Sequence, residues 1–321
     1  MSFIREFDKK KCKQVKENKL WEKLFSDIKD GIVYPAIRKE RLDFYYAGGV
    51  LFRFEGKSYK FNTEYFKYIK ELDPDLNILP YAGIKGSYKS VDTLEREIGK
   101  KNYFYNNYDK LKEGIELKFS SKKNSKSVEC YLDLEDDKEN MDKERKFLAQ
   151  LYSYTYRKQD ETTPKVIVLD IEIRANLEDG ENGKKCDMLL FNMESNELMF
   201  VEAKLSGNPE VKSNSNEVKV FQQMDNYNNW FENAGDDFTK QYKKYIKIIS
   251  KGLNLFPYKI NEDKLDTLKM HEKVKLFIAN GDSDFQIKHL GKIYDRLGSE
   301  NVCYFDRSEN ENITPEAIWN R

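Results

Sequence analysis

The stretch 165–205 places charged side chains inside three short segments that otherwise have the composition of β-strands. β-Branched and aliphatic residues dominate 166–173, 188–191 and 198–205, with Gly, Asn and Glu between them, so three successive strands are predicted. Asp187 opens the second segment, and Glu202 and Lys204 lie inside the third. Because side chains alternate along a strand, Glu202 and Lys204 point to the same face. Buried charges need compensation, and a metal ion would compensate the acids.

The order of these charges resembles the motif of the PD-(D/E)xK nucleases, which have a restriction-endonuclease-like core. Asp187 is followed, after a hairpin-length gap, by the Glu-Ala-Lys of 202–204. The family pattern has Pro before the Asp, whereas this chain has Cys186. A second Glu-x-Lys, at 116–118, lies in a charged stretch without an Asp-opened partner strand, so we interpret it as a coincidence.

Two predicted helices flank the three strands and extend the resemblance. Residues 139–156 have a helical stripe of apolar residues into which Glu144 projects. Members of the family commonly carry such a Glu facing the metal site, and Glu172 competes for this accessory role here. In the helix predicted after the third strand, Gln223 and Tyr227 match the QxxxY pattern of the RecB-type branch. The order of helix Glu, strand, Asp strand, ExK strand and Gln helix is therefore complete.

The resemblance implies an enzyme: a metal-dependent nuclease that hydrolyses phosphodiester bonds of nucleic acid, with DNA favoured over RNA. Its cofactor would be Mg²⁺, or Mn²⁺, held by carboxylate oxygens. The metal ligands would be Asp187, Glu202, Glu144 and the carbonyl of Ala203. Lys204 would position the attacking water and stabilise the developing charge, and Gln223 would orient the phosphate or Lys204. Lys204→Ala is then expected to abolish cleavage and to leave the fold intact. Free-standing nucleases of this kind often resemble restriction or phage-defence endonucleases.

Each of these residues also has a structural explanation. Asp187 could cap a turn, and Gln223 could hydrogen-bond to backbone in the core. Glu202 and Lys204 could form a solvent-facing cross-strand ion pair worth roughly 0.2–1 kcal/mol. Glu144 could form an ion pair with a neighbouring basic residue. If the chain had this fold without catalytic activity, it would be a catalytically silent nucleic-acid- or protein-binding module of a larger complex. The apolar surroundings of Glu202 favour a covered strand and hence a site.

Length and charge predict how the chain is divided. The 321 residues suggest two domains, at 1–135 and 136–321. Residues 1–130 hold 28 Lys and Arg against 20 Asp and Glu, and the remainder holds 28 against 36, so the two parts carry +8 and −8. A basic first part hints at phosphate contact, and we expect residues 1–135 to recognise the substrate, an activating ligand or a partner.

The predicted fold combines an amino-terminal α+β domain with an α/β nuclease domain. Alternating apolar and polar residues over 42–62, with turns at 48–49 and 56–57, predict an antiparallel meander in the first domain. The second domain is expected to hold a restriction-endonuclease-like mixed β-sheet flanked by helices. A strand, helix and strand over 274–305 would complete that sheet by a crossover connection.

Composition narrows the chemistry and the cellular setting. The 4 Cys are scattered without CxxC pairing, which predicts a reducing cytoplasm and no zinc site. With only 2 His in the sequence, a Ser-His-Asp triad or a metal site with several His ligands is not favoured. No apolar run approaches the roughly 20 residues of a membrane span, so no membrane partner is expected. Cutting of two strands would favour a homodimer, although no coiled-coil heptad indicates one.

Overall fold

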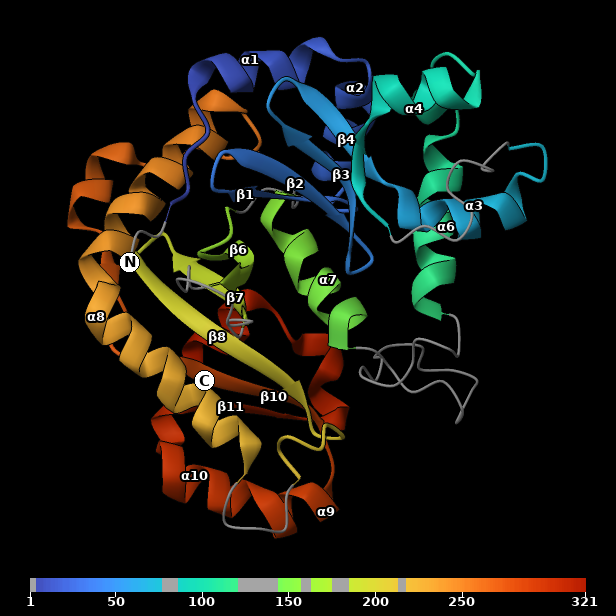
Figure 1. Cartoon of the computed structure of the whole chain (residues 1–321). Helices are drawn as coiled ribbons and strands as arrows, with labels where there is room; N and C mark the ends of the chain where they lie inside the picture. Colours follow the sequence, from blue (N-terminus) through green and yellow to red (C-terminus); the bar gives the residue numbers. More distant parts are fainter. Residues whose placement is uncertain (1–3, 77–85, 121–143, 157–162, 175–184, 213–217) are drawn as a thin grey trace.

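The computed structural model describes residues 4–76, 86–120, 144–156, 163–174, 185–212 and 218–321. Within these ranges the chain is an α+β protein with two β-sheets, one antiparallel and one mixed (Figure 1). None of the helices in these ranges is long and apolar enough to span a membrane. The domain boundary predicted between 135 and 136 lies outside the described residues and stays a prediction.

The first sheet is antiparallel, and its five strands follow one another in chain order. The strands are β1 (Tyr34–Arg38), β2 (Arg41–Tyr46), β3 (Gly49–Glu55), β4 (Ser58–Asn62) and β5 (Tyr88–Ser90). The predicted meander is therefore present as β2, β3 and β4. Its first turn uses Ala47 and Gly48, with φ of +46° and +80°, because Gly49 already begins β3. Two successive positive φ values are typical of the type I′ hairpin turn.

Helices of the first part pack their apolar faces on this sheet. They are α1 (Lys9–Glu17), α2 (Leu20–Lys29), α3 (Phe66–Leu72), α4 (Val91–Ile98), α5 (Tyr103–Asn106) and α6 (Tyr108–Ser120). Phe104 of α5 packs edge-on against Phe52 of β3, and both rings are fully buried. Tyr103, Phe104 and Tyr108 thus belong to the core. The Glu-x-Lys at 116–118 lies in helix α6, so it has no strand geometry.

The second sheet contains the three strands predicted for 165–205. Its order is β11-β10-β8-β7-β6, with β9 paired to β8. The strands are β6 (Val166–Arg174), β7 (Lys185–Asn192), β8 (Glu197–Leu205), β9 (Lys269–Met270), β10 (Lys275–Gly281) and β11 (Val302–Asp306). β6, β7 and β8 are antiparallel neighbours, and β8, β10 and β11 run parallel. The crossover between β10 and β11 passes through α9 (Ser283–Phe285) and α10 (Gly291–Leu297).

Two helices cover opposite faces of the second sheet. Phe200 of β8 stacks on a ring of α8 (Lys219–Lys247), with 4.1 Å between ring centroids. Phe277 of β10 stacks on a ring of α7 (Glu144–Tyr156) at 5.6 Å. Phe277 is in register with Ala203, which alternates with the residues on the Phe200 face, so the two rings point to opposite sides. α7 also contacts β1 and therefore lies between the two sheets (Figure 1).

Side chains of the two sheets meet in one continuous core. The buried apolar residues of both sheets belong to a single hydrophobic cluster. Tyr34 of β1 lies 5.3 Å, between ring centroids, from both Tyr152 and Tyr156 of α7, and its hydroxyl donates to the Val168 carbonyl of β6 at 2.7 Å. The amino-terminal sheet is therefore attached to the sheet that carries the candidate catalytic residues.

Candidate functional site

The candidate site lies where β7 and β8 separate. Paired residues of the two strands end at Met188 and Val201. Just beyond that pair, the Asp187 Oδ2 atom accepts a hydrogen bond from the Ala203 N–H at 2.9 Å. The Cys186 thiol donates to the Val201 carbonyl, with 3.4 Å between sulfur and oxygen. Side chains of β7 therefore satisfy backbone groups of β8 at the split, and this fixes the Asp187 carboxylate beside the Glu-Ala-Lys segment.

Glu202 and Lys204 form a buried ion pair on the face that α8 covers. The Lys204 Nζ atom lies 2.6 Å from Glu202 Oε1, and the side chains of Lys204 and Glu202 are 7% and 1% exposed. The prediction that both point to one face is confirmed, and the alternative of a solvent-facing ion pair is wrong. The two buried charges compensate each other. The ion pair itself therefore offsets part of the cost of burying Glu202, which a metal ion was expected to offset.

Helix α8 adds Gln223 and Tyr227 to the site. The Tyr227 hydroxyl donates to the Lys185 carbonyl at 2.6 Å, and the neighbouring Gln223 side chain acts to lower the pKa of Tyr227. Residues four apart lie on one face of a helix, so the Gln223 and Tyr227 side chains are neighbours on α8. Burial raises the pKa of Tyr227, and the charges of Glu202 and Asp187 raise it further. The QxxxY pair predicted from the sequence therefore lies near both carboxylates.

The two acids considered for the accessory role have different positions. Glu144 is the first residue of α7, and its side chain lies outside the described residues, so its role stays a prediction. Where α7 is described, it packs on the face opposite to Glu202. The Glu172 carboxylate forms an ion pair with Lys185 Nζ and lines a separate cavity.

Sequence reasoning missed Glu210. Its Oε2 atom lies 3.3 Å from the Lys204 Nζ atom, in the chain segment that follows β8, and its side chain is 39% exposed. No sequence pattern indicates this contact, because it depends on the path of an irregular segment. Lys204 consequently lies between the buried carboxylate of Glu202 and the more exposed carboxylate of Glu210.

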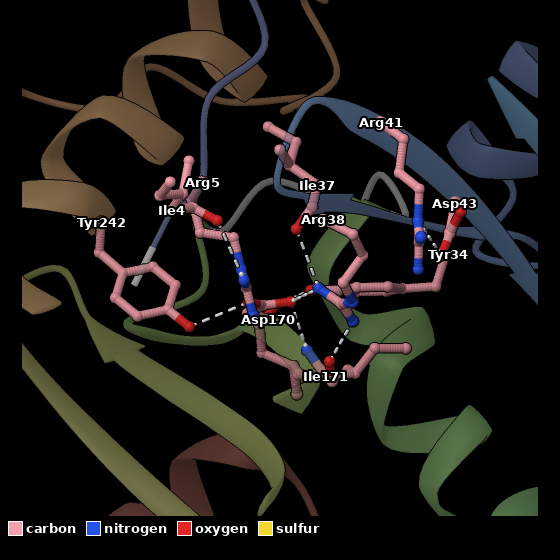
Figure 2. A network of polar contacts seen from close by, with 11 residues as sticks. Ile4, Arg5, Tyr34, Ile37, Arg38, Arg41, Asp43, Asp170, Ile171 and Tyr242 are labelled. Carbon is pink, nitrogen blue, oxygen red and sulfur yellow. Dashed lines mark hydrogen bonds and ion pairs between the residues drawn. The ribbon is translucent and has the colours of Figure 1, made fainter. Parts of the chain in front are cut away.

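Asp170 was also missed, although a signal for it is present. It lies in the apolar strand β6, as Glu202 lies in β8, and it is fully buried. Its carboxylate lies 3.0 Å from Arg5 Nε and 2.6 Å from Arg38 Nη1, and it accepts from the Tyr242 hydroxyl at 2.9 Å (Figure 2). Arg38 also donates to the Ile171 carbonyl. This network joins the amino-terminal segment, β1, β6 and α8.

The donors at the split suit a hard divalent cation. Asp187 and Glu202 provide carboxylate oxygens, and Mg²⁺ commonly uses one or two protein carboxylates while it keeps several waters. Burial raises the pKa of the Cys186 thiol, and the charges of Glu202 and Asp187 raise it further, so both carboxylates act on one buried group. In the part of the chain that the structure describes, no three Asp, Glu, His or Cys side chains gather as a metal-binding group. The described donor set is thus a pair of carboxylates.

Replacing Tyr227 with Phe is expected to lower the free energy of unfolding by about 1 kcal/mol, because the Lys185 carbonyl loses its 2.6 Å hydrogen bond. Urea denaturation measures this change. Tyr105→Phe is the matched control, since the Tyr105 hydroxyl contacts Glu22 on the surface at 3.3 Å and its loss is expected to cost less than about 0.5 kcal/mol. Equal stability of the two variants would show that the Tyr227 bond does not hold α8 to β7.

Comparisons of the chain with protein-family models, with curated proteins and with solved structures found no match. The function is therefore inferred from the residues of the site.

Proposed function

We propose that the chain is a Mg²⁺- or Mn²⁺-dependent nuclease with a site of the PD-(D/E)xK type. One observation carries the proposal: an acid of β7 and a Glu-x-Lys pair of β8 lie together where the two strands separate. Asp187 is held there by the Ala203 N–H at 2.9 Å, and Lys204 is held by Glu202 at 2.6 Å. The acidic and basic groups that phosphodiester hydrolysis needs are thus at one place on the sheet.

The order of elements supports a restriction-endonuclease-like core. Along the chain, α7 is followed by the antiparallel strands β6, β7 and β8, then by α8, and then by β10, which is parallel to β8. The resulting sheet is mixed and has a helix on each face. This is the arrangement that the resemblance to the nuclease family implies for residues 136–321.

In the proposed reaction, the oxygen of a water forms a bond to phosphorus, the bond from phosphorus to the leaving oxygen breaks, and the leaving oxygen takes up a proton. Asp187 and Glu202 would hold the metal ion, which when bound would lower the pKa of a water and withdraw charge from the phosphate. The Lys204 ammonium would stabilise the negative charge that develops on the phosphate oxygens. Glu202 and Glu210, at 2.6 and 3.3 Å, orient that ammonium. Gln223 would orient the phosphate or Lys204.

Removal of the metal tests the proposal directly. The purified full chain is incubated with supercoiled plasmid, linear duplex, single-stranded DNA and RNA, with Mg²⁺, with Mn²⁺ or with EDTA. We expect cleavage of at least one substrate, DNA in preference to RNA, with either metal and none with EDTA, because Asp187 and Glu202 need a cation to activate water. Cleavage that persists in EDTA would contradict a metal-dependent mechanism.

A negative result has a defined meaning. If no substrate is cut and calorimetry detects neither Mg²⁺ nor Mn²⁺ binding, the same fold would serve as a catalytically silent binding module, and the nuclease proposal would be rejected. Lys204→Ala is a poor variant for this purpose, because it leaves the 1% exposed Glu202 side chain without the ammonium. Loss of one partner of a buried pair costs roughly 3–5 kcal/mol, so lost activity would not separate catalysis from folding.

A further inference from the structure

A basic cavity lies between the amino-terminal sheet and the ends of β6 and β7. Its volume is about 550 Å³, within the range of roughly 300–1,000 Å³ that small-molecule sites occupy. Of the 15 described residues that line it, 5 are Arg and 2 are Lys, whereas the acidic ones among them are Asp43 and Glu172. The wall is therefore strongly positive, although the whole chain has a net charge of +0. We call this space the arginine cavity.

Two carboxylates are shared between arginines of the wall. Asp43, which is 1% exposed, lies 2.7 Å from Arg53 Nε and 3.4 Å from Arg41 Nε. Asp170, which is not among the described lining residues, pairs with both Arg5 and Arg38 (Figure 2). One negative charge for each two arginines leaves positive charge at the surface of the cavity. An anion that enters would offset this excess, since charges in a partly buried site interact strongly.

Tyrosine rings lie against two guanidinium groups of the wall. The Arg53 guanidinium carbon lies 3.8 Å from the centroid of the Tyr88 ring, and that of Arg38 lies 5.6 Å from the Tyr45 ring. The Tyr88 ring, together with Asp43, to which Arg53 Nε and Nη2 bond at 2.7 and 3.3 Å, keeps the Arg53 guanidinium in one orientation. Tyrosine rings also offer a surface on which a base can stack.

We propose that the arginine cavity binds the phosphate groups of a nucleotide, either free or at the end of a nucleic-acid strand. The excess of guanidinium groups over carboxylates in the described wall favours a phosphate over a single carboxylate, and the neighbouring tyrosines favour a base attached to it. The cavity includes Lys185, the first residue of β7, and Asp187 follows it two residues later. A ligand in the cavity would thus contact the strand that carries the candidate metal ligand. The proposal stands without the nuclease activity, because the volume, the charge and the aromatic rings of the cavity do not depend on what the carboxylate pair does.

Calorimetry in EDTA tests the cavity separately from the metal site. ADP and adenosine are titrated into the full chain, followed by one oligonucleotide with and without a terminal phosphate. We expect ADP or the phosphorylated oligonucleotide to bind at least about tenfold more tightly than its unphosphorylated counterpart, because charge-assisted hydrogen bonds to phosphate are lost in the latter. Binding of ADP would identify a free nucleotide, and binding of the phosphorylated oligonucleotide alone would identify a strand end. No detectable binding of either phosphorylated probe would overturn the proposal.

Variants locate the binding. Arg41→Gln combined with Arg174→Gln removes two guanidinium groups from the wall. The Arg41 side chain is 35% exposed and Arg174 is also exposed, so the fold is expected to remain intact. We expect this double variant to bind the phosphorylated probe at least about tenfold more weakly. Arg307→Gln is the control, since Arg307 bonds to Asn280 at 2.8 Å and does not line the cavity. Unchanged affinity in the double variant would overturn the assignment, and thermal unfolding confirms that each variant is folded.

Discussion

Asp187→Asn is expected to reduce metal-dependent hydrolysis at least about a hundredfold and to leave stability nearly unchanged. The substitution removes the negative charge from a candidate metal ligand. The amide oxygen of Asn can still accept the Ala203 N–H bond that the carboxylate now makes at 2.9 Å. The free energy of unfolding is therefore expected to change by less than about 1 kcal/mol. Initial rates on the cleaved substrate, measured across a Mg²⁺ titration, and urea denaturation give the two quantities.

The control for this variant is Asp225→Asn, which makes the same chemical change on α8. Asp225 pairs with Arg296 at 2.6 Å, and its side chain is 45% exposed. We expect this control to cleave at the rate of the unmodified chain. Full activity of Asp187→Asn would show that Asp187 is not part of the catalytic site, whereas lost activity together with lost stability would show that Asp187 acts mainly as a structural cap of β8.

Asp170→Asn is expected to lower the free energy of unfolding by about 3–5 kcal/mol, because it leaves two arginines buried without their counter-charge. Arg5 and Arg38 are 3% and 9% exposed, and both pair with this fully buried carboxylate. Asp225→Asn again provides the comparison. Its pair has the same 2.6 Å separation as the Arg38 pair but is exposed to solvent, so its loss is expected to cost less than about 1 kcal/mol. Urea denaturation that finds equal losses would contradict the importance of burial here.

The pKa of Asp170 also leads to a prediction of how stability depends on pH. Burial alone would raise the pKa of Asp170, but the charges of Arg38 and Arg5 and their hydrogen bonds lower it below its ordinary value. In the unfolded chain the pKa of an Asp is about 3.9. A pKa that is lower in the folded state means that the stabilisation is present above pH about 4 and is lost as the pH falls from there through the folded value. Free energies of unfolding measured from neutral to acidic pH are therefore expected to fall more steeply below pH about 4 in the unmodified chain than in Asp170→Asn. Parallel curves would refute this linkage.

Local sequence patterns determined the strands and helices that carry the candidate site. Alternation along a strand is a property of residues two apart, so it placed Glu202 and Lys204 on one face before any packing was known. The helical period likewise placed Gln223 and Tyr227 on one side of α8, with Tyr227 buried. The turn between β2 and β3 was predicted one residue late, because the sequence offers two adjacent glycines and the strand register uses the second as its first residue.

Only the tertiary structure decided which charges meet. Asp170 contacts Arg5 and Arg38 from 165 and 132 residues away, and no local period links positions so distant. The contact of Glu210 with Lys204 depends on an irregular segment, and the arginine cavity exists because the two sheets pack beside each other. The amino-acid sequence thus determined the local elements and the composition of the candidate nuclease site. The mutual compensation of buried charges and the arginine cavity were decided by packing, because the free energy of a buried charge depends on all the groups that surround it.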